Sequence, residues 1–575
     1  MRFTLVLIIL LSFFSGCENK PKTIADSRVN DYALYDEKGN LHRMSRYNDS
    51  KGIVLFLQGN GCPIVRNLLT DFHQIVLDYN DKGFQFFMLK SNPQDNRTRV
   101  LEEATTFGFK VPVLLDSGQL LANELDLRIT AEVLVLHPTT REILYRGPLN
   151  NRLDYETQQN EATEKYLRKA LDNILSGERP LTKQEVTRGC TITRLSDTAS
   201  KVNYTNDIAP ILAEYCVKCH NDNGIAPWSM TDYHTVSGWS SMMKQVLLSK
   251  RMPPWKADPE VSAFENSLHL PDSNARKIIE WIDNGLTRGK GIDTLESISP
   301  VSKGWKYGEP NKIVELKTEE IPATGVIPYR YQEFSLDLSE DTWISGLEIK
   351  PGNRKVVHHI LLTSKNPDKT NPIVHRKKRK WIDNFIALGG SVDESTIFPD
   401  STGVLFRKDE TLVIQIHYTP TGKPEKDQTK LGFYFSEGKP KKEFRSLSPA
   451  NVKFTIPAYE KNVRIVARDT ITKKIIIYSM APHMHYRGKS IKMKAILPNG
   501  DEKVMVSVPD FSFNWQFMYK LENPMSLPAG SIIEVEGIFD NSFQNPLNPD
   551  PSKILGFGIQ STDEMLIGFL NYTLD

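Results

Sequence analysis

The stretch that most constrains this chain is Cys216-Val217-Lys218-Cys219-His220. Two thiols separated by two residues and followed at once by an imidazole are the attachment signature of a c-type haem. The thiols form thioethers with the porphyrin, and the histidine then ligates the iron from one side. A zinc knuckle and a disulfide loop are the alternatives, but zinc would need a second ligand pair, and the chain has no other closely spaced cysteines. We therefore predict one covalent haem c (iron), held by Cys216, Cys219 and His220.

Helical patterns surround this motif. Tyr204 to Leu212 forms a short amphipathic segment before it, and the apolar residues between Asn274 and Leu286 recur at helical spacing after it. Helix, motif, methionine loop and closing helix resemble a small class I cytochrome c, which implies an all-α domain over residues 200–290. The resemblance also implies a methionine as the sixth iron ligand. Met252 is our candidate, because the two prolines after it would stiffen its loop. The alternatives are Met230, Met242 and Met243, and all four could be core residues.

The N-terminus has the pattern of a targeting signal. Arg2 precedes an apolar run from Leu5 to Phe14, which is too short to span a bilayer permanently. The run ends in Phe14-Ser15-Gly16-Cys17, which resembles a bacterial lipoprotein box. Residues 1–17 would then be a signal peptide, and Cys17 would carry the lipid that anchors the protein to the cell envelope, facing the periplasm or the exterior. An ordinary cleaved signal, in which Cys17 has no role, is the alternative.

Composition excludes several classes of protein. A length of 575 residues predicts several domains. The 72 basic and 70 acidic residues nearly balance, so we expect no nucleic-acid partner. Five cysteines are too few for a fold held together by disulfides.

Residues 28–180 alternate strand-like and helix-like patterns. The apolar run Ile53 to Leu57 predicts a buried strand, and Cys62 follows at the turn into a helical stretch. This α/β pattern resembles a thioredoxin-like redoxin domain.

The redox motif of that family is incomplete in this chain. Val65 stands where the second cysteine of a CxxC pair is expected, and Ala131 stands where the family carries a proline opposite the redox site. Without a nearby resolving thiol a dithiol cycle is not available, so we expect a docking or structural role. Pairing of Cys62 with Cys190, or a single-thiol role for Cys62, remains an alternative.

From about residue 300 the pattern changes to short alternating strands separated by Gly, Pro, Asn and Asp. This spacing predicts two all-β sandwiches, over residues 305–440 and 448–575. Five histidines stand at informative places in them: His358, His359, His417, His483 and His485. In a strand, His483 and His485 project from one face and suit one metal. His358 and His359 would point to opposite faces unless a bulge or twist intervenes.

Each of these histidines taken alone is more commonly a hydrogen-bonded core residue. Together the pairs, the Gln-x-His-Tyr around His417, and Ser561-Thr562-Asp563-Glu564-Met565 resemble the type II copper monooxygenases, the relatives of peptidylglycine hydroxylating monooxygenase and dopamine β-hydroxylase. Those modules are two jelly-roll-like sandwiches that hold two copper ions. The resemblance implies an electron-transfer copper on His358, His359 and His417. It implies a catalytic, oxygen-binding copper on His483, His485 and Met565, whose thioether favours Cu(I).

The chain also departs from that family. Peptide-amidating members hold their substrate with an arginine two residues before the His-x-His, and Ala481 stands there instead. Apolar residues follow Met565, at Leu566 and Ile567. A small organic substrate is therefore a better expectation than a peptide.

Together these patterns suggest a copper-dependent monooxygenase that hydroxylates a C–H bond of an unidentified organic substrate with O2. Electrons from a periplasmic donor or an ascorbate-like reductant would pass through the haem c to the copper. The alternative is a lipid-anchored haem c electron-transfer protein with a non-catalytic copper-binding β-sandwich module.

Overall fold

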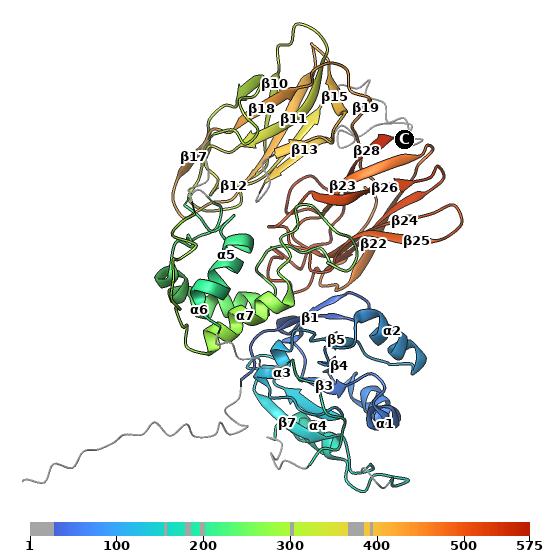
Figure 1. The fold of residues 1–575 in the computed structure, drawn as a ribbon. Helices are drawn as coiled ribbons and strands as arrows, with labels where there is room; N and C mark the ends of the chain where they lie inside the picture. Colours follow the sequence, from blue (N-terminus) through green and yellow to red (C-terminus); the bar gives the residue numbers. More distant parts are fainter. Residues whose placement is uncertain are drawn as a thin grey trace, which may run out of the picture.

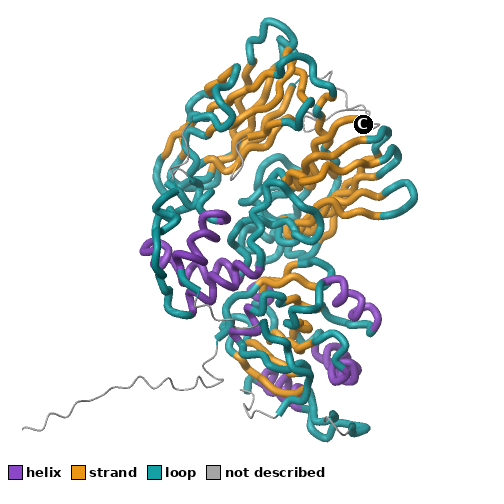
Figure 2. Tube along the Cα trace, viewed as in Figure 1, coloured by secondary structure: helices purple, strands orange, loops and turns teal. Residues whose placement is uncertain are grey.

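The computed structural model describes residues 28–153, 158–178, 186–195, 202–222, 224–298, 304–365, 385–390 and 395–575. Along the chain it has an α/β unit, a helical middle region, and then several antiparallel sheets (Figure 1). Figure 2 shows that the helices gather in the first two regions and that strands dominate the second half. No helix within the described ranges has the length and apolar composition needed to cross a bilayer.

The N-terminal unit is a seven-stranded sheet in the order β2-β1-β5-β4-β3-β6-β7. Its strands are β1 (Ala33–Asp36), β2 (Leu41–Arg43), β3 (Gly52–Gln58), β4 (Phe84–Lys90), β5 (Val113–Leu115), β6 (Glu132–Leu136) and β7 (Ile143–Pro148). Its helices are η2 (Met44–Tyr47), α1 (Pro63–Tyr79), α2 (Arg97–Thr106), α3 (Leu120–Glu124) and α4 (Tyr166–Ser176). Every residue of β3 is buried, as expected for a central strand covered on both faces. Alternate side chains such as Leu55 and Phe56 enter separate cores on opposite faces of the sheet.

The middle region packs short helices around one core. Its elements are η3 (Tyr204–Ile208), α5 (Ala209–Tyr215), α6 (Tyr233–Leu248) and α7 (Asp272–Asp283). Tyr204, Leu212 and Trp281 are fully buried in that core. Cys216 ends α5, so the CxxCH motif forms the turn directly after this helix.

The first β unit contains two sheets that share one core. One sheet has the order β10-β16-β12-β13, and the other has β19-β15-β11-β18-β8 with β14 beside β11. The first sheet consists of β10 (Arg330–Ser335), β12 (Val357–Ser364), β13 (Phe385–Gly390) and β16 (Thr411–Tyr418). The second sheet consists of β8 (Lys312–Glu315), β11 (Thr342–Lys350), β14 (Ser395–Ile397), β15 (Thr402–Phe406), β18 (Lys430–Phe435) and β19 (Lys442–Glu443). Beside these two sheets, β9 (Glu319–Ile321) and β17 (Glu425–Asp427) pair as a separate two-stranded sheet. Apolar side chains from β11 and β18 pack against those of β12 and β16.

The second β unit repeats this plan. One sheet has the order β20-β28-β23-β26 with β21 beside β28, and the other has β22-β27-β24-β25. Its strands are β20 (Arg445–Leu447), β21 (Ala450–Asn451), β22 (Val463–Thr470), β23 (Ile475–His483), β24 (Gly488–Ile496), β25 (Glu502–Val508), β26 (Tyr519–Leu527), β27 (Ile532–Phe539) and β28 (Leu566–Leu574). The core of this unit also takes in Trp255, Ala257, Phe264 and Leu268, which follow α6. Part of the region expected to form the haem domain therefore packs inside the second β unit, where Phe264 forms a β-bridge with Leu521.

Buried ion pairs join three regions at one point. Asp510, after β25, accepts hydrogen bonds from Arg43 of β2 at 2.7 Å and from Lys256 of the middle region at 3.0 Å. Nearby, Arg97 of α2 binds Asp258 at 2.7 Å. Burial opposes the charge of Asp510, yet the two cations lower its pKa to about 2. The carboxylate therefore stays ionised and holds the regions together.

Candidate functional site

A β-bulge brings the first three histidines together. In the pairing of β12 with β16, His359 lies opposite His417, and the register shifts between Val357 and His359. The shift turns His358 toward the same side as His359, which a regular strand would not allow. The Nδ1 atoms of His358 and His359 are 2.9 Å apart, and the Nδ1 atom of His417 is 3.2 Å from that of His358. One nitrogen from each ring lies within 4.8 Å of the others, so the three rings can share one metal ion.

The second group lies at the paired ends of two strands. His483 ends β23, His485 follows two residues later, and Met565 precedes β28, the neighbour of β23 in the sheet. All three side chains line one small cavity, together with His359. The Nδ1 of His485 faces the carbonyl of Asp563 at 3.2 Å and must carry the proton, because a carbonyl only accepts. Its Nε2 therefore presents a lone pair, and it has no partner among the described residues.

Two aromatic rings connect the groups. The Phe513 ring centre lies 5.3 Å from that of His358 and 5.7 Å from that of His485. The Tyr329 ring lies 5.0 Å from the His417 ring and 6.4 Å from the His485 ring. The Tyr329 hydroxyl is buried, lacks a hydrogen-bond partner in the described structure, and belongs to a residue that lines the cavity. Tyr329 and Phe513 therefore contact both histidine groups, and His359 of the first group borders the cavity of the second.

Burial keeps these imidazoles neutral. It lowers the pKa of His358 to about 4 and that of His483 to about 4. Burial, with the neighbouring His358 ring, lowers the pKa of His417 to about 3. The pKa values of His359 and His485 are also lowered well below the usual value, for the same reasons. A metal ion needs neutral imidazole, so all five rings are ready to ligate at neutral pH.

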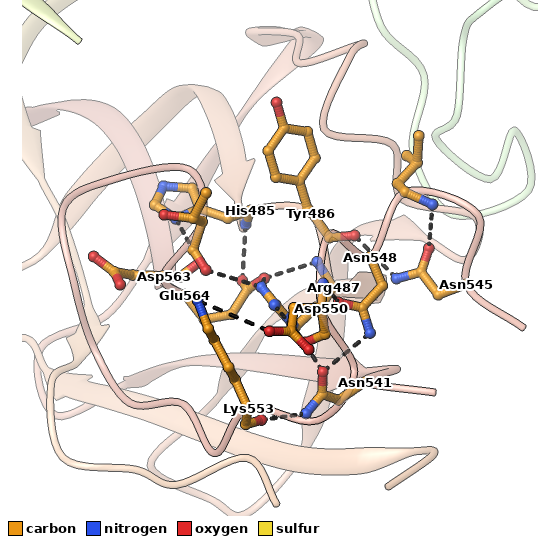
Figure 3. A network of polar contacts seen from close by, with 12 residues as sticks. His485, Tyr486, Arg487, Asn541, Asn545, Asn548, Asp550, Lys553, Asp563 and Glu564 are labelled. Atoms are coloured by element: carbon orange, nitrogen blue, oxygen red, sulfur yellow. Dashed lines mark hydrogen bonds and ion pairs between the residues drawn. The ribbon is translucent and has the colours of Figure 1, made fainter. Parts of the chain in front are cut away.

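A buried carboxyl group fixes the loops of the second group (Figure 3). Glu564 accepts the backbone N–H groups of His485 at 3.1 Å and of Arg487 at 2.7 Å, and Met565 follows it directly in the chain. The fully buried guanidinium of Arg487 lies 3.9 Å from the carboxyl group and donates to Asn541 at 2.9 Å. Burial raises the pKa of Glu564 to about 8, against the opposing charge of Arg487. These contacts hold the backbone of His485 against that of Met565.

Backbone hydrogen bonds hold the CxxCH stretch as a compact turn. The backbone N–H groups of Cys219 and His220 both bond to the Cys216 carbonyl, and the two thiols are not joined to each other. The Nδ1 of His220 faces the Trp228 carbonyl at 3.1 Å, so it carries the proton and leaves the Nε2 lone pair for a metal. Burial raises the pKa of Cys216 to about 12. Within the described chain, only the His358 group brings three or more His, Cys, Asp or Glu ligands together, and so no zinc set surrounds these thiols.

The structure does not bring Met252 to His220 through any described contact. Met252 lines a cavity of about 70 Å³ that also borders residues 32–35 of the N-terminal unit. Met230 donates its backbone N–H to the His220 carbonyl, and Met243 is buried in the same core as Met230. Met242 is half exposed.

The remaining candidate cysteines divide into two cases. Cys17 lies outside the described residues. Cys62 and Cys190 form a disulfide across a separation of 128 residues, so the alternative pairing named above is the one that occurs. At the place expected for a proline, Ala131 has a φ of 61° and donates its N–H to the Leu57 carbonyl.

Comparisons with known proteins address the N-terminal unit. Residues 25–147 match the AhpC/TSA family, so the chain carries a thioredoxin-like redoxin domain of a thiol oxidoreductase family. A hypothetical protein from Sinorhizobium meliloti is 25% identical over 30% of this chain and 95% of its own, with a TM-score of 0.28. An uncharacterized conserved protein from Geobacillus kaustophilus is 26% identical over 29% and 92%, with a TM-score of 0.27. A peroxidoxin from Mycobacterium tuberculosis is 16% identical over 26% and 94%, with a TM-score of 0.21. No curated protein matches the sequence.

Several residues of the site are not evident from the sequence. Tyr329 and Phe513 stand in no recognisable motif, although their rings contact both histidine groups. Gln516 hydrogen-bonds the Nδ1 of His483 from a loop more than thirty residues away. Glu564 directly precedes Met565 in the sequence. An acidic residue next to a proposed metal ligand is the one sequence signal that could have indicated its part in holding the site.

Proposed function

We propose that this chain is a copper-dependent monooxygenase that hydroxylates a C–H bond of a small organic substrate, with electrons supplied through a covalent haem c. One oxygen atom of O2 enters the C–H bond, and two electrons and two protons convert the other into water. The observation that carries this proposal is the convergence of five neutral imidazoles, three of them buried and two half-buried, and one thioether from four separate segments. Core histidines satisfied by hydrogen bonds would not leave the Nε2 atoms of His358 and His485 without partners.

The donor set fits two copper ions. His358, His359 and His417 would hold the electron-transfer copper, and His483, His485 and Met565 would hold the catalytic one. When bound, copper supplies one-electron redox chemistry and activation of O2. The protein supplies the protonation state and the orientation of the ligands. Burial keeps the rings unprotonated, and the Asp563 carbonyl fixes the His485 tautomer so that the Nε2 lone pair would be available to a metal. In this proposal the two β units are the jelly-roll-like modules of the copper monooxygenases.

Electrons would reach this site from the middle region. Cys216, Cys219 and His220 would hold the haem, with Met252 or a neighbouring methionine as the sixth ligand. Burial raises the pKa of Cys219, and the charges of Lys218 and Arg354 oppose that rise. Arg354 is four residues before His358, and its effect on the pKa of Cys219 supports a CxxCH turn near the start of the strand that carries the first histidine group. In Figure 1, α5 lies beside the end of the sandwich that carries β12 and β17. A periplasmic donor or an ascorbate-like reductant would supply the electrons, and a lipid on Cys17 would anchor the protein.

The cavity suggests the class of substrate. Leu361, Leu388, Ile567 and Phe569 form an apolar wall of the cavity that His483 and Met565 also line. An apolar wall binds an apolar molecule, which agrees with Ala481 standing in place of a carboxylate-binding arginine. The cavity volume is about 20 Å³, room for about one water-sized molecule, so substrate entry requires movement of this wall.

The same small volume favours a second candidate. A cavity too small for an organic molecule agrees with a lipid-anchored haem c electron-transfer protein. Its β units would bind copper but would catalyse no reaction. The two candidates differ in what they do with O2.

Metal content and O2 uptake test the proposal. Protein matured in a periplasm and loaded with copper should contain two copper ions and one haem per chain. The reduced protein should consume O2 when small alkylbenzenes or alkanes are added, and stopped-flow spectra should show haem reoxidation at the same rate. The His485→Ala variant should lose one copper ion and O2 uptake but keep its haem. Two bound copper ions with no O2 uptake for any compound would favour the carrier, and no copper binding would refute both.

A further inference from the structure

A strap of residues 187–195 covers the redoxin domain beside Cys62. Thr191 forms a β-bridge with Ile129, and the Cys190 carbonyl accepts the Thr130 N–H at 2.8 Å. Farther along, Gln119 donates its side-chain amide to the Thr193 carbonyl at 2.7 Å. The strap ends just before the residues that lead into the helical middle region. It therefore ties the linker between the redoxin and haem regions to the redoxin domain.

The two sulfurs of the disulfide are not equivalent. Cys62 is 4% exposed and caps the N-terminus of the seventeen-residue helix α1, whereas Cys190 is partly exposed on the strap. Cys190 is therefore the more accessible residue of the pair. A cavity of about 360 Å³ lies between the first turns of α1 and the strap, lined by apolar residues such as Ile64 and Leu68 and by polar ones such as Asn150, Arg152 and Thr187.

The surroundings of Cys62 make it the better leaving group. The Thr130 hydroxyl oxygen accepts the Cys190 N–H at 2.9 Å, so its own hydrogen is free to point at the Cys62 sulfur, 3.1 Å away. A helix N-terminus and a hydroxyl donor both stabilise a thiolate. Exchange is faster when the departing sulfur is the more stable thiolate.

We propose that Cys62 and Cys190 form a reversible dithiol–disulfide couple that serves an external protein dithiol, with Cys190 as the sulfur that is attacked. The partner thiolate forms a bond to the Cys190 sulfur, the Cys62–Cys190 bond breaks, and its electron pair leaves on Cys62. The second partner thiolate then attacks the mixed disulfide, forms the partner's own disulfide, and releases Cys190. Two electrons pass from the dithiol to this chain, and the strap loses its covalent attachment. The thiol missing at Val65 is thus replaced by one 128 residues away from Cys62.

Trapping of the mixed disulfide tests the direction of attack. The full-length oxidised protein is treated with an excess of the monothiol glutathione, alkylated with iodoacetamide and mapped by peptide mass. The adduct is expected on Cys190, with Cys62 alkylated. An adduct on Cys62 would overturn the proposal, and so would a disulfide that dithiothreitol reduces no faster than the buried disulfide of a structural reference protein.

Two variants test the surroundings of the leaving sulfur. Thr130→Val should slow reduction by dithiothreitol about tenfold, because a hydrogen bond to the departing thiolate is lost. Thr191→Val, on the exposed side of the strap, is the matched control and should not change the rate.

Hydrogen exchange of the strap amides should rise about 100-fold on reduction, since only noncovalent contacts then hold it. Equal rates for the two threonine variants, or a strap that exchanges no faster after reduction, would count against the proposal.

Discussion

Lowering the pH of the metal-free protein should open the region around the two histidine groups. The pKa of His358 and that of His483 are lowered to about 4, and that of His417 to about 3, whereas an unfolded histidine titrates near pH 6.5. Below pH 6.5 these histidines are therefore protonated in the unfolded chain but remain neutral in the folded protein. The stabilisation is fully present above pH 6.5 and is lost as the pH falls toward 4.

The size of the effect follows from these values. Each pH unit below 6.5 removes about 1.4 kcal/mol per ring, so a drop to pH 5 removes about 2 kcal/mol per ring. Three rings together lose about 6 kcal/mol, a large part of the ~5–15 kcal/mol that stabilises a typical domain. His359 and His485 shift in the same direction and add to the loss.

Hydrogen exchange followed by mass spectrometry can measure this locally. Peptides from β12, β16 and β23 should lose at least about 30-fold in protection between pH 7 and pH 5, after correction for the intrinsic exchange rate. Saturating copper should remove most of the difference, because the metal competes with the protons. His417→Asn should reduce the pH dependence of protection by about the contribution of one ring. His234→Asn is the control, because His234 lies in α6, outside both histidine groups, and should leave the pH dependence unchanged. Equal protection at the two pH values in the metal-free protein would refute the reasoning.

Three further perturbations have definite expected results. Cys219→Ser should leave haem attached through one thioether, so that the pyridine haemochrome band moves to longer wavelength; an unchanged band would argue against attachment at this motif. Asp510→Asn should leave two buried cations without their shared carboxylate, at a cost of about 3–5 kcal/mol, and limited proteolysis at the junction should accelerate. The exposed pair of Asp49 with Lys461 provides the control, since Asp49→Asn should change the cleavage rate little. Tyr329→Phe removes a buried hydroxyl that has no hydrogen-bond partner among the residues the structure describes, so stability in urea should stay equal or rise by about 1 kcal/mol; a clear loss would show an unrecognised hydrogen bond.

The sequence predicted the features of the fold that depend on residues close together in the chain. The apolar run of β3 indicated a central strand, and the cysteine before α1 indicated the redoxin fold that the family match supports. The CxxCH turn is also local, because backbone hydrogen bonds from Cys219 and His220 to the Cys216 carbonyl define it.

The features that the sequence did not predict depend on contacts between segments far apart in the chain. The two-histidine stretch was ambiguous because the bulge at His358 depends on the register of β12 against β16. The partner of Cys62 depends on where a linker folds back across the sheet. Tyr329 and Phe513 come from loops of different β units, and periodicity carries no information on where such loops meet.

Four side chains after α6, Trp255, Ala257, Phe264 and Leu268, are built into the interior of the second β unit. The segment that follows α6 is therefore not a separable domain, and a deletion that removed it would take core residues from the second β unit, far along the chain. A rigid link of this kind sets one fixed path length between the proposed iron and copper centres. We expect internal electron flow to be insensitive to solvent viscosity, whereas a tethered carrier that swings between partners would slow as viscosity rises.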